Sequence, residues 1–427
     1  MALALSTPAS RSAWHPLYRQ ALLHYRRGQI EASLALLEQL PQQQIQEDLD
    51  TVLLIGFNLF RSVQLARLSD HLRRHHGLAD QPEMQLLRAR LWRAQGDLEE
   101  AASLLQLLRT GSDAGRVRRQ ASFELAAIED QRRNYATAWA IAAEEHQRST
   151  LPYSIELQEQ SLRLTAESAR RSGPALIRQA SRRVEQTAFL MGLPRSGTSL
   201  LEQMLDQHGR VSGIGETAFP GRMADAIAAE ERGWPSGAQR VPISCLNGLQ
   251  DAYNEFVRLE LEVPLDHWSV DKTVFPMTQP LAIACVLPGA TMIRMIRDPF
   301  DTLVSIFLAN MEPSWGWTGS VESILRMIYS ERMFVPIILE SLEIPHLQVE
   351  YESLVKQPRP VLTTVLKTMG LPLEEACLHP ERNQRVVMTL SHDQVRQAIH
   401  ADSIGRWQNY AEFLPKALFA DAADTCP

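Results

Sequence analysis

The chain has 427 residues, a formal net charge of −7 and 45% apolar residues, which suffices for two or three domains with cores of their own. The negative charge, with no basic run to offset it, excludes a general nucleic-acid binder. Four scattered cysteines without a C-x-x-C pair predict reduced thiols and a cytoplasmic protein, with neither a disulfide framework nor a zinc site. The apolar runs are too short to span a membrane, and the first residues do not resemble a secretory signal.

Residues 1–170 are predicted to form helices throughout. Three segments share apolar residues at three- and four-residue spacings around a central turn residue: 18–40, 86–108 and 123–146. The turn residues Gly28 and Gly96 are 68 residues apart, twice a helix-turn-helix period of about 34 residues, so a degenerate unit is expected near 52–80. This texture resembles tetratricopeptide repeats, three recognisable and one eroded. The alternative is an unrelated helical bundle.

Residues 187–420 have a different pattern, in which short β-rich runs lead into helical segments. The runs are 187–193, 291–296 and 346–351, and the segments that follow them are 198–207, 299–309 and 353–369. This alternation predicts a parallel sheet with helices on both faces. The stretch 171–186 is expected to be a linker or a connecting helix. The expected fold is therefore an α-helical, tetratricopeptide-like repeat domain joined to an α/β domain of the P-loop type.

The segment MGLPRSGTSLLEQML, residues 191–205, resembles a phosphate-binding loop. From Gly192 it reads Gly-x4-Gly-Thr-Ser, between a β-rich run and an amphipathic helix. Such a turn lets backbone N–H groups converge on an anion at the helix N-terminus. Thr198 stands where a triphosphate-binding loop has lysine, and Arg195 supplies a cation instead. Because a sulfuryl group carries less charge than a γ-phosphoryl group, the loop is expected to bind a phosphosulfate rather than a triphosphate.

A second motif, MIRDPFDTLVS, occupies residues 295–305. Asp298 can cap the helix that the following proline begins. Arg297 then lies at the end of a strand and Ser305 two turns into the helix, so the two side chains can hold a second phosphate together. The alternative is that Arg297 forms a surface ion pair with Asp301.

Together, GLPRSGTSLLEQML, IRDPFDTLVS about 100 residues later, VEYESLV and SIGRW resemble the sulfotransferase superfamily. More narrowly, the chain is similar to bacterial sulfotransferases with tetratricopeptide repeats, which are related to tyrosylprotein sulfotransferases. The resemblance covers essentially the whole chain and is strongest over 187–410. It implies transfer of a sulfuryl group from 3′-phosphoadenosine 5′-phosphosulfate to a hydroxyl, without a metal. The implied cofactor-binding residues are Arg195, Ser196, Gly197, Thr198 and Ser199 on the 5′ side, Arg297 and Ser305 at the 3′-phosphate, and Tyr351, Ser403 and Arg406.

Two residues are candidates for the chemistry itself. Glu216 ends a short β-rich run at a strand end that faces the ligand crevice, so it can take the proton of the acceptor hydroxyl. Its match to the GEE-type motif of tyrosylprotein sulfotransferases implies the same role. Lys272 is one of four lysines beside 39 arginines, and its compact ammonium suits charge on the oxygen between sulfur and the leaving phosphate. The alternative is that both are ordinary surface charges, and then His208 and His267 are the next candidate bases.

The chain departs from the family pattern at two places. It has Gly209 after His208, where family members usually have proline, and Ala401 before DSIGRW, where they often have arginine or lysine. Arg406 or Arg396 is expected to compensate. The rival functions are a kinase that uses ATP and a non-catalytic repeat scaffold. The acceptor stays open among a peptide tyrosine, a sugar, a lipid and a small phenol, and a peptide or protein would bind with help from the repeats.

Overall fold

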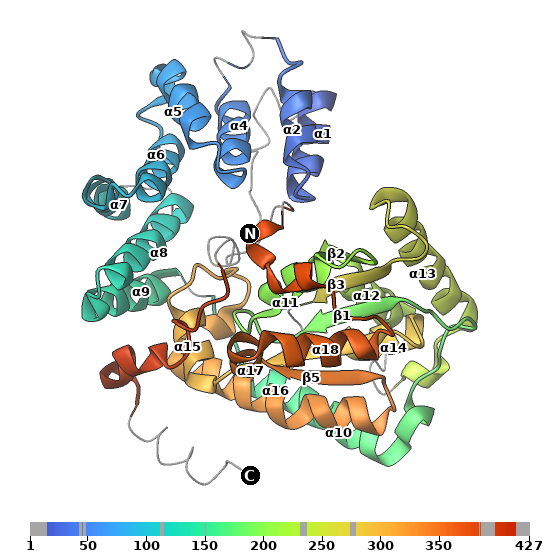
Figure 1. Ribbon diagram of the computed structural model, residues 1–427. Coiled ribbons are helices and arrows are strands. Elements are labelled where there is room, and N and C mark those ends of the chain that lie inside the picture. Colours follow the sequence, from blue (N-terminus) through green and yellow to red (C-terminus); the bar gives the residue numbers. More distant parts are fainter. Residues whose placement is uncertain are drawn as a thin grey trace.

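The computed structural model describes residues 15–41, 45, 48–111, 115–149, 151–230, 237–273, 279–383, 385 and 398–415. Arg396 lies outside these residues. Figure 1 shows an arc of paired helices that leads into a parallel sheet flanked by further helices. Within the described ranges, no helix is long and apolar enough to cross a membrane.

The N-terminal region consists of successive helix pairs, each joined by a tight turn with one residue at positive φ. These turn residues recur every 33 to 37 positions, so a helix pair does occupy the place where a degenerate unit is expected. Whether the pairs are tetratricopeptide repeats stays a prediction. The turn residues are Gly28 (φ 75°), Val63 (58°), Gly96 (94°) and Arg133 (64°). The helices are α1 (Pro16–Arg26), α2 (Ile30–Leu37), α4 (Leu49–Arg61), α5 (Leu65–Arg74), α6 (Pro82–Gln95), α7 (Leu98–Gly111), α8 (Gly115–Gln131) and α9 (Tyr135–Ser149).

Five strands form the sheet, in the order β2-β3-β1-β4-β5. All neighbours pair in parallel, which confirms the predicted parallel sheet and brings the carboxyl ends of the strands to one edge. The sequence-based expectation lacks β3, because Asp271 and Lys272 interrupt its apolar run. Both are buried, at 0% and 1% exposure. The strands are β1 (Thr187–Met191), β2 (Val211–Gly215), β3 (Trp268–Thr273), β4 (Thr291–Ile296) and β5 (His346–Glu350).

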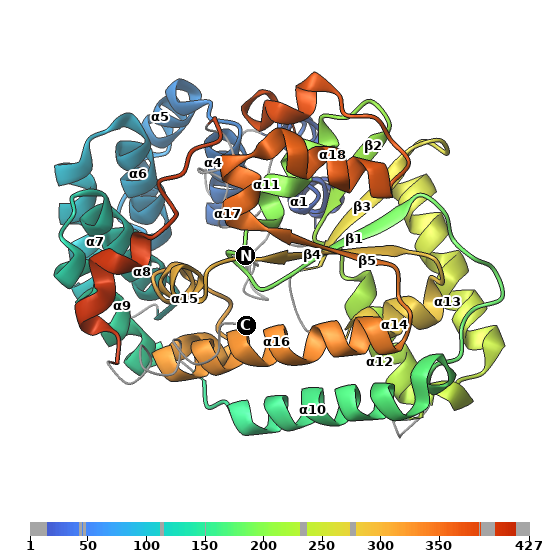
Figure 2. The same cartoon turned by 60° about the horizontal axis from the view of Figure 1, so that its bottom comes forward.

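Helices cover both faces of the sheet (Figure 2). Along β1, Ala188 and Leu190 pack on the side of α11, α17 and α18, while Phe189 and Met191 pack on the side of α10, α12, α13, α14 and α16. This alternation follows from the period of two along a strand. The helices are α10 (Ile155–Ser172), α11 (Thr198–Asp206), α12 (Phe219–Glu230), α13 (Ile243–Glu255), α14 (Gln279–Val286), α15 (Pro299–Phe307), α16 (Val321–Ser341), α17 (Tyr351–Lys356) and α18 (Pro358–Thr368).

The segment expected to be one helix over 353–369 is divided into α17 and α18. Gln357, at φ −137° and ψ 64°, leaves the helical conformation, and Pro358 begins the next helix. Proline disfavours helical geometry in the residue before it, which explains the break. Shorter helical turns are η2 (His76–Leu78), η3 (Gly173–Leu176), η4 (Ala238–Arg240), the π-helical η5 (Phe256–Glu260), η6 (Gly316–Gly319), η7 (Glu375–Leu378), η8 (Pro380–Arg382) and η9 (Arg406–Phe413).

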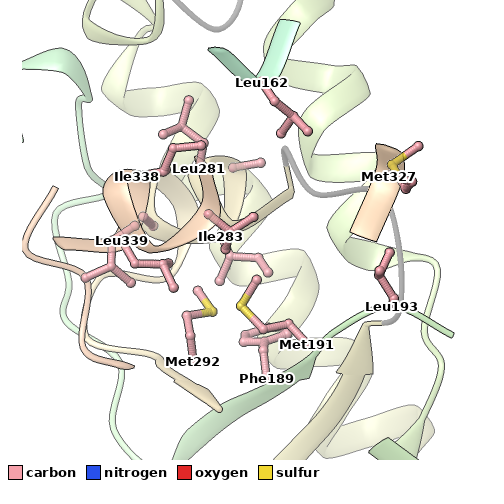
Figure 3. Close-up of a cluster of buried hydrophobic side chains, with 14 of the residues drawn as sticks. Leu162, Phe189, Met191, Leu193, Leu281, Ile283, Met292, Met327, Ile338 and Leu339 are labelled. Atoms are coloured by element: carbon pink, nitrogen blue, oxygen red, sulfur yellow. The ribbon is translucent and has the colours of Figure 1, made fainter. Parts of the chain in front are cut away.

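Figure 3 shows part of the core on one face of the sheet. Phe189 and Met292 lie near Ile283 of α14 and Leu339 of α16, with Leu162 of α10 nearby, and all are at most 1% exposed. Burying each such side chain contributes about 1.5–3 kcal/mol. Helix α10 thus packs with the sheet region, and the predicted domain boundary at residue 170 stays a prediction.

The helix pairs and the sheet region also share a packed junction between α9 and α15. The indole of Trp139 stacks on Phe307 with 4.2 Å between ring centroids. The Nε2 of His146 lies 2.8 Å from the Phe307 carbonyl oxygen. Burial lowers the pKa of His146 to about 4, so a neutral imidazole donates this hydrogen bond at physiological pH. The end of α15 is therefore fixed by the N-terminal helices.

Candidate functional site

Neither of the two glycines in the loop between β1 and α11 has room for a side chain. A Cβ on Gly192 would lie 2.7 Å from the Met295 carbonyl oxygen, and one on Gly197 would lie 2.5 Å from Cδ2 of Tyr351. Gly197, at φ 100°, is the N-cap of α11 and brings no side chain to its first N–H groups. Positive partial charge therefore gathers at a helix N-terminus whose N-cap residue supplies no acceptor, an arrangement that suits an anion.

The hydroxyls at this loop suit the same ligand. Ser196 is 2% exposed, and its Oγ has no hydrogen-bond partner among the described residues. Thr198 and Ser199, in the first turn of α11, are also buried. A buried hydroxyl without a partner is costly, because it has lost its bonds to water. An anion seated in the loop would satisfy it, so the loop fits the predicted phosphosulfate group.

Lys272 and Glu216 meet beside this loop. The Lys272 ammonium donates to Glu216 Oε1 at 2.7 Å and to Ser199 Oγ at 3.2 Å. Lys272 is 1% exposed on β3, whereas the Glu216 side chain, directly after β2, is 44% exposed. The structure thus brings the two predicted catalytic residues together, with the ammonium enclosed beside the loop and the carboxylate accessible from solvent.

Two carboxylates that the sequence analysis missed fix the end of β2. Asp271 accepts a hydrogen bond from the Thr217 hydroxyl at 2.5 Å, and Glu202 of α11 accepts one from the Gly215 N–H at 2.8 Å. These contacts lie on either side of Glu216 in the chain. The adjacency of Asp271 to Lys272 on one strand is the signal that could have revealed the first of them.

A second cluster joins the 3′-side residues to the loop. Arg195 Nε donates to Ser305 Oγ at 2.9 Å, and Arg297 donates to the carbonyl oxygens of Arg195 at 3.0 Å and Ser403 at 2.5 Å. The Arg297 guanidinium also lies 4.7 Å from the ring centre of Tyr351. Five predicted cofactor residues therefore converge at the carboxyl edge of the sheet.

Arg297 is suited to holding an anion. It is 8% exposed, and its Nε has no hydrogen-bond partner within the described part of the chain. Burial lowers the pKa of Arg297, although the guanidinium stays charged. A buried cation with a donor to spare favours a negatively charged ligand beside it.

The alternative of an exposed pair between Arg297 and Asp301 is wrong. Asp301 is 2% exposed and accepts hydrogen bonds from the backbone N–H groups of Gly405 at 2.7 Å and Trp407 at 2.9 Å. As expected, the Asp298 carboxylate caps α15 by accepting from the first N–H groups of the helix. The sequence analysis missed that Asp301 anchors the SIGRW segment.

Three further residues from the sequence analysis have other partners. Arg406 forms an ion pair with Asp130 of α8 at 2.8 Å. His208 is buried between the carbonyl oxygen of Pro372 and the N–H of Arg210, at 3.0 Å each. His267 Nδ1 lies 3.1 Å from the Ser212 hydroxyl.

Metal ligands do not gather in the part of the chain that the structure describes. There, no group of three or more His, Cys, Asp and Glu side chains is placed to hold a metal ion. The expectation of a metal-free reaction stays a prediction.

Residues 188–375 are similar to a known protein family. This segment matches the model of the sulfotransferase family. Over 333 residues the chain is 25% identical to an uncharacterised protein of Aquifex aeolicus, an alignment that covers 75% of this chain and 43% of that protein. It is 25% identical over 235 residues to protein-tyrosine sulfotransferase 1 of Danio rerio, which covers 51% of this chain and 64% of that protein. The chain thus spans less than two thirds of either relative.

Solved structures of sulfotransferase domains are also similar. The domain of the Synechococcus PCC 7002 olefin synthase is 22% identical, with a TM-score of 0.37, over 56% of this chain and 99% of that one. The domain of the curacin biosynthetic pathway is 18% identical, with a TM-score of 0.36, over 51% of this chain and 84% of that one.

Proposed function

Because residues 188–375 match the model of the sulfotransferase family, we propose that the chain transfers a sulfuryl group from 3′-phosphoadenosine 5′-phosphosulfate to a hydroxyl acceptor. The observation that carries this proposal is the contact of Lys272 with both Glu216 and Ser199, at 2.7 Å and 3.2 Å. Three separate elements bring a proton acceptor, an ammonium and the anion loop within reach of one another. Sulfuryl transfer to a hydroxyl needs these three groups.

The donor would bind across both clusters. Its 5′-phosphosulfate would accept from the β1–α11 loop, where the Ser196 hydroxyl has no partner among the described residues and Gly197 supplies no cap to the helix. Its 3′-phosphate would lie against Arg297, whose Nε is buried and unused among the described residues. The remaining proposed contacts come from Arg195, Thr198, Ser199, Ser305, Tyr351 and Ser403. Arg406, which pairs with Asp130, would act on the donor only indirectly.

In the proposed reaction the donor supplies the sulfuryl group, and this chain's residues handle the proton and the charge. Glu216 would accept the proton of the attacking hydroxyl. As the bond between sulfur and the acceptor oxygen forms, the bond between sulfur and the bridging oxygen breaks. The bridging oxygen leaves as part of adenosine 3′,5′-bisphosphate, and Lys272 would neutralise the negative charge that develops on it.

We further propose that the acceptor is a tyrosine hydroxyl of a peptide or protein. The support is the similarity to protein-tyrosine sulfotransferases of Danio rerio and, at 24% identity over 259 residues, of Caenorhabditis elegans. The helix pairs, which lie beside the sheet region in Figure 1, would help to bind such an acceptor.

A transfer assay with radiolabelled donor in the presence of a chelator tests this function. Labelled sulfate should appear on a tyrosine peptide and not on a matched phenylalanine peptide. Glu216→Gln should lower turnover by about 10²–10⁴-fold, because it keeps shape and polarity but accepts no proton. Its affinity for adenosine 3′,5′-bisphosphate should be unchanged.

Other results of these assays would indicate a different base or a different function. Wild-type turnover in Glu216→Gln would return the base to His208 or His267. Phosphorylation of the peptide from ATP and Mg²⁺ would establish the kinase. Binding of peptide with no transfer to any hydroxyl would establish the scaffold.

A further inference from the structure

The SIGRW segment is held by a carboxylate from the N-terminal helices. Asp130 of α8 pairs with Arg406 at 2.8 Å and accepts a hydrogen bond from the Tyr410 hydroxyl. The side chains of Asp130 and Arg406 are only 23% and 24% exposed. Burial acts to lower the pKa of Arg406, but the charges and hydrogen bonds of Asp130 and Tyr410 together outweigh it, so the pKa is raised. The pair is therefore attractive despite its partial burial.

The opposite side of the same segment is bound to the cofactor cluster. Asp301 accepts from the N–H groups of Gly405 at 2.7 Å and Trp407 at 2.9 Å, and the Ser403 carbonyl accepts from Arg297 at 2.5 Å. Arg297 is the proposed ligand of the donor's 3′-phosphate. Residues 403–410 thus link a side chain of the helical region to a side chain of the donor site.

Aromatic packing makes this link stiff. Tyr410 is 0% exposed and meets Tyr135 of α9 at 5.3 Å between ring centroids. Trp139 of α9 stacks with both Phe307 of α15, at 4.2 Å, and Phe413, at 5.7 Å. In Figures 1 and 2 the red segment that contains η9 lies against α9. A packed, hydrogen-bonded segment of this kind can transmit a local change rather than absorb it.

We propose that Asp130 is a positioning residue of the donor site, which holds Arg406 and through residues 403–407 sets the place of Arg297. The helical region is then part of the machinery that binds the 3′-phosphate, besides any role in acceptor binding. This inference rests on the proposed function. We call the Asp130–Arg406 ion pair the clasp. In this role Arg406 is not a direct ligand of the donor.

Two measurements on the full chain test the proposal with the variant Asp130→Asn. Hydrogen exchange without any nucleotide reports the clasp itself, and peptides that contain the N–H groups of Gly405 and Trp407 should exchange about tenfold faster. Calorimetry reports the consequence. Affinity for adenosine 3′,5′-bisphosphate should fall by about 5- to 10-fold, whereas affinity for AMP, which lacks the 3′-phosphate, should stay unchanged.

Glu124→Gln is the matched control. Glu124 lies on the same helix and loses the same kind of ion pair, with Arg90 at 2.5 Å, but inside the helical region. It should change neither measurement. A loss in Asp130→Asn equal to that in Glu124→Gln, or equal losses for both nucleotides, would overturn the proposal, since either result means general loosening.

A double-mutant cycle separates a clasp from a ligand. If Arg406 acts only through Asp130, Arg406→Gln alone, Asp130→Asn alone and the double variant should weaken the bisphosphate by the same factor. Additive losses, with Arg406→Gln the larger, would make Arg406 a direct ligand and overturn the proposal. If the wild type binds no bisphosphate, the proposed function fails and the donor-site role of Asp130 fails with it, while unchanged exchange in Asp130→Asn would refute the clasp alone.

Discussion

Two strand–helix units of the same sheet, β1 with α11 and β4 with α15, differ in whether the N-cap residue accepts hydrogen bonds from the first N–H groups of the helix. The N-cap of helix α11 is Gly197, which offers the first N–H groups no side-chain acceptor. The N-cap of helix α15 is Asp298, whose carboxylate accepts from the N–H groups of Phe300 and Asp301. The N-cap residue of α11 thus supplies no acceptor, which suits an external anion, whereas the N-cap residue of α15 satisfies the first N–H groups of its helix.

This difference indicates that the two units have different roles. The β1–α11 unit lies beside Lys272 and Glu216, where bonds would be made and broken. The β4–α15 unit contributes fixed side chains, Arg297 and Ser305, that connect to the loop through Arg195. Substitutions of Lys272 and Glu216 should therefore lower turnover, whereas substitutions in the β1–α11 loop itself and at the β4–α15 turn should lower affinity or stability.

The largest effect is expected at Lys272. Lys272→Arg keeps the charge, but the broad guanidinium does not fit the enclosed position of a compact ammonium. Single-turnover sulfuryl transfer should fall by about 10²-fold or more, the usual cost of a misplaced electrostatic donor. Thermal unfolding serves as the control for folding. Full activity in this variant would assign Lys272 to the structure rather than to the chemistry.

Arg297→Ala should weaken binding without a matching loss in turnover at saturating donor. Losing a buried, charge-assisted hydrogen bond costs about 1.5–3 kcal/mol, or about 10- to 150-fold in affinity. The loss should appear with adenosine 3′,5′-bisphosphate and not with adenosine 5′-phosphosulfate, which has no 3′-phosphate. Equal losses for both ligands would show that Arg297 does not bind the 3′-phosphate.

Gly197→Ala should lower both the stability of the protein and its affinity for an anion at the N-terminus of α11. The left-handed backbone costs a non-glycine residue about 1–2 kcal/mol, and the new Cβ would also meet Tyr351 at 2.5 Å. Gly96→Ala is the matched control, because Gly96 has a similar φ of 94° and open space around it. Denaturant unfolding should show a greater loss for Gly197→Ala, together with weaker bisphosphate binding. Equal stability losses and intact binding would contradict the role given to the loop.

The smallest effect concerns the cap of α15. Burial raises the pKa of Asp298 above its ordinary value of 3.8, so the folded state holds this proton to higher pH than the unfolded state does. The stabilisation from that proton is present at low pH and is lost as pH rises through the raised pKa. Asp298→Asn can still cap the helix but does not titrate. Relative to the variant, the wild type should lose some free energy of unfolding as pH rises through this window, which pH-dependent unfolding measures. Parallel curves would mean that the carboxylate does not titrate differently on folding.

Both strand–helix units were predictable from the sequence because their signals are local. The expected helices at 198–207 and 299–309 match α11 and α15 to within two residues. Glycine spacing, a capping aspartate and an apolar run each act over a few positions. Strand β3 was not predicted, because local patterns do not show that its two charged residues, Asp271 and Lys272, are buried through contacts with Thr217 and Glu216.

Contacts between distant segments were beyond local reasoning. That Glu216 and Lys272 have a role is a prediction from strand ends and residue usage, but their 2.7 Å contact depends on the pairing of β2 with β3. Arg406 was expected to reach the cofactor, yet its partner is Asp130 in the helical region. The residues near Arg406 and Asp130 in the sequence do not indicate this ion pair, which depends on how the helical region packs against the sheet region.

In the proposed function, the β1–α11 loop binds a phosphosulfate donor without a metal. Calorimetric titration of the full chain with adenosine 3′,5′-bisphosphate in EDTA, and separately with ATP with and without Mg²⁺, tests this binding. The bisphosphate should bind in EDTA, with an affinity about tenfold or more above that of ATP under either condition, since the loop lacks the lysine of a triphosphate site. A Mg²⁺ requirement for the bisphosphate, or tighter binding of ATP, would contradict this proposal.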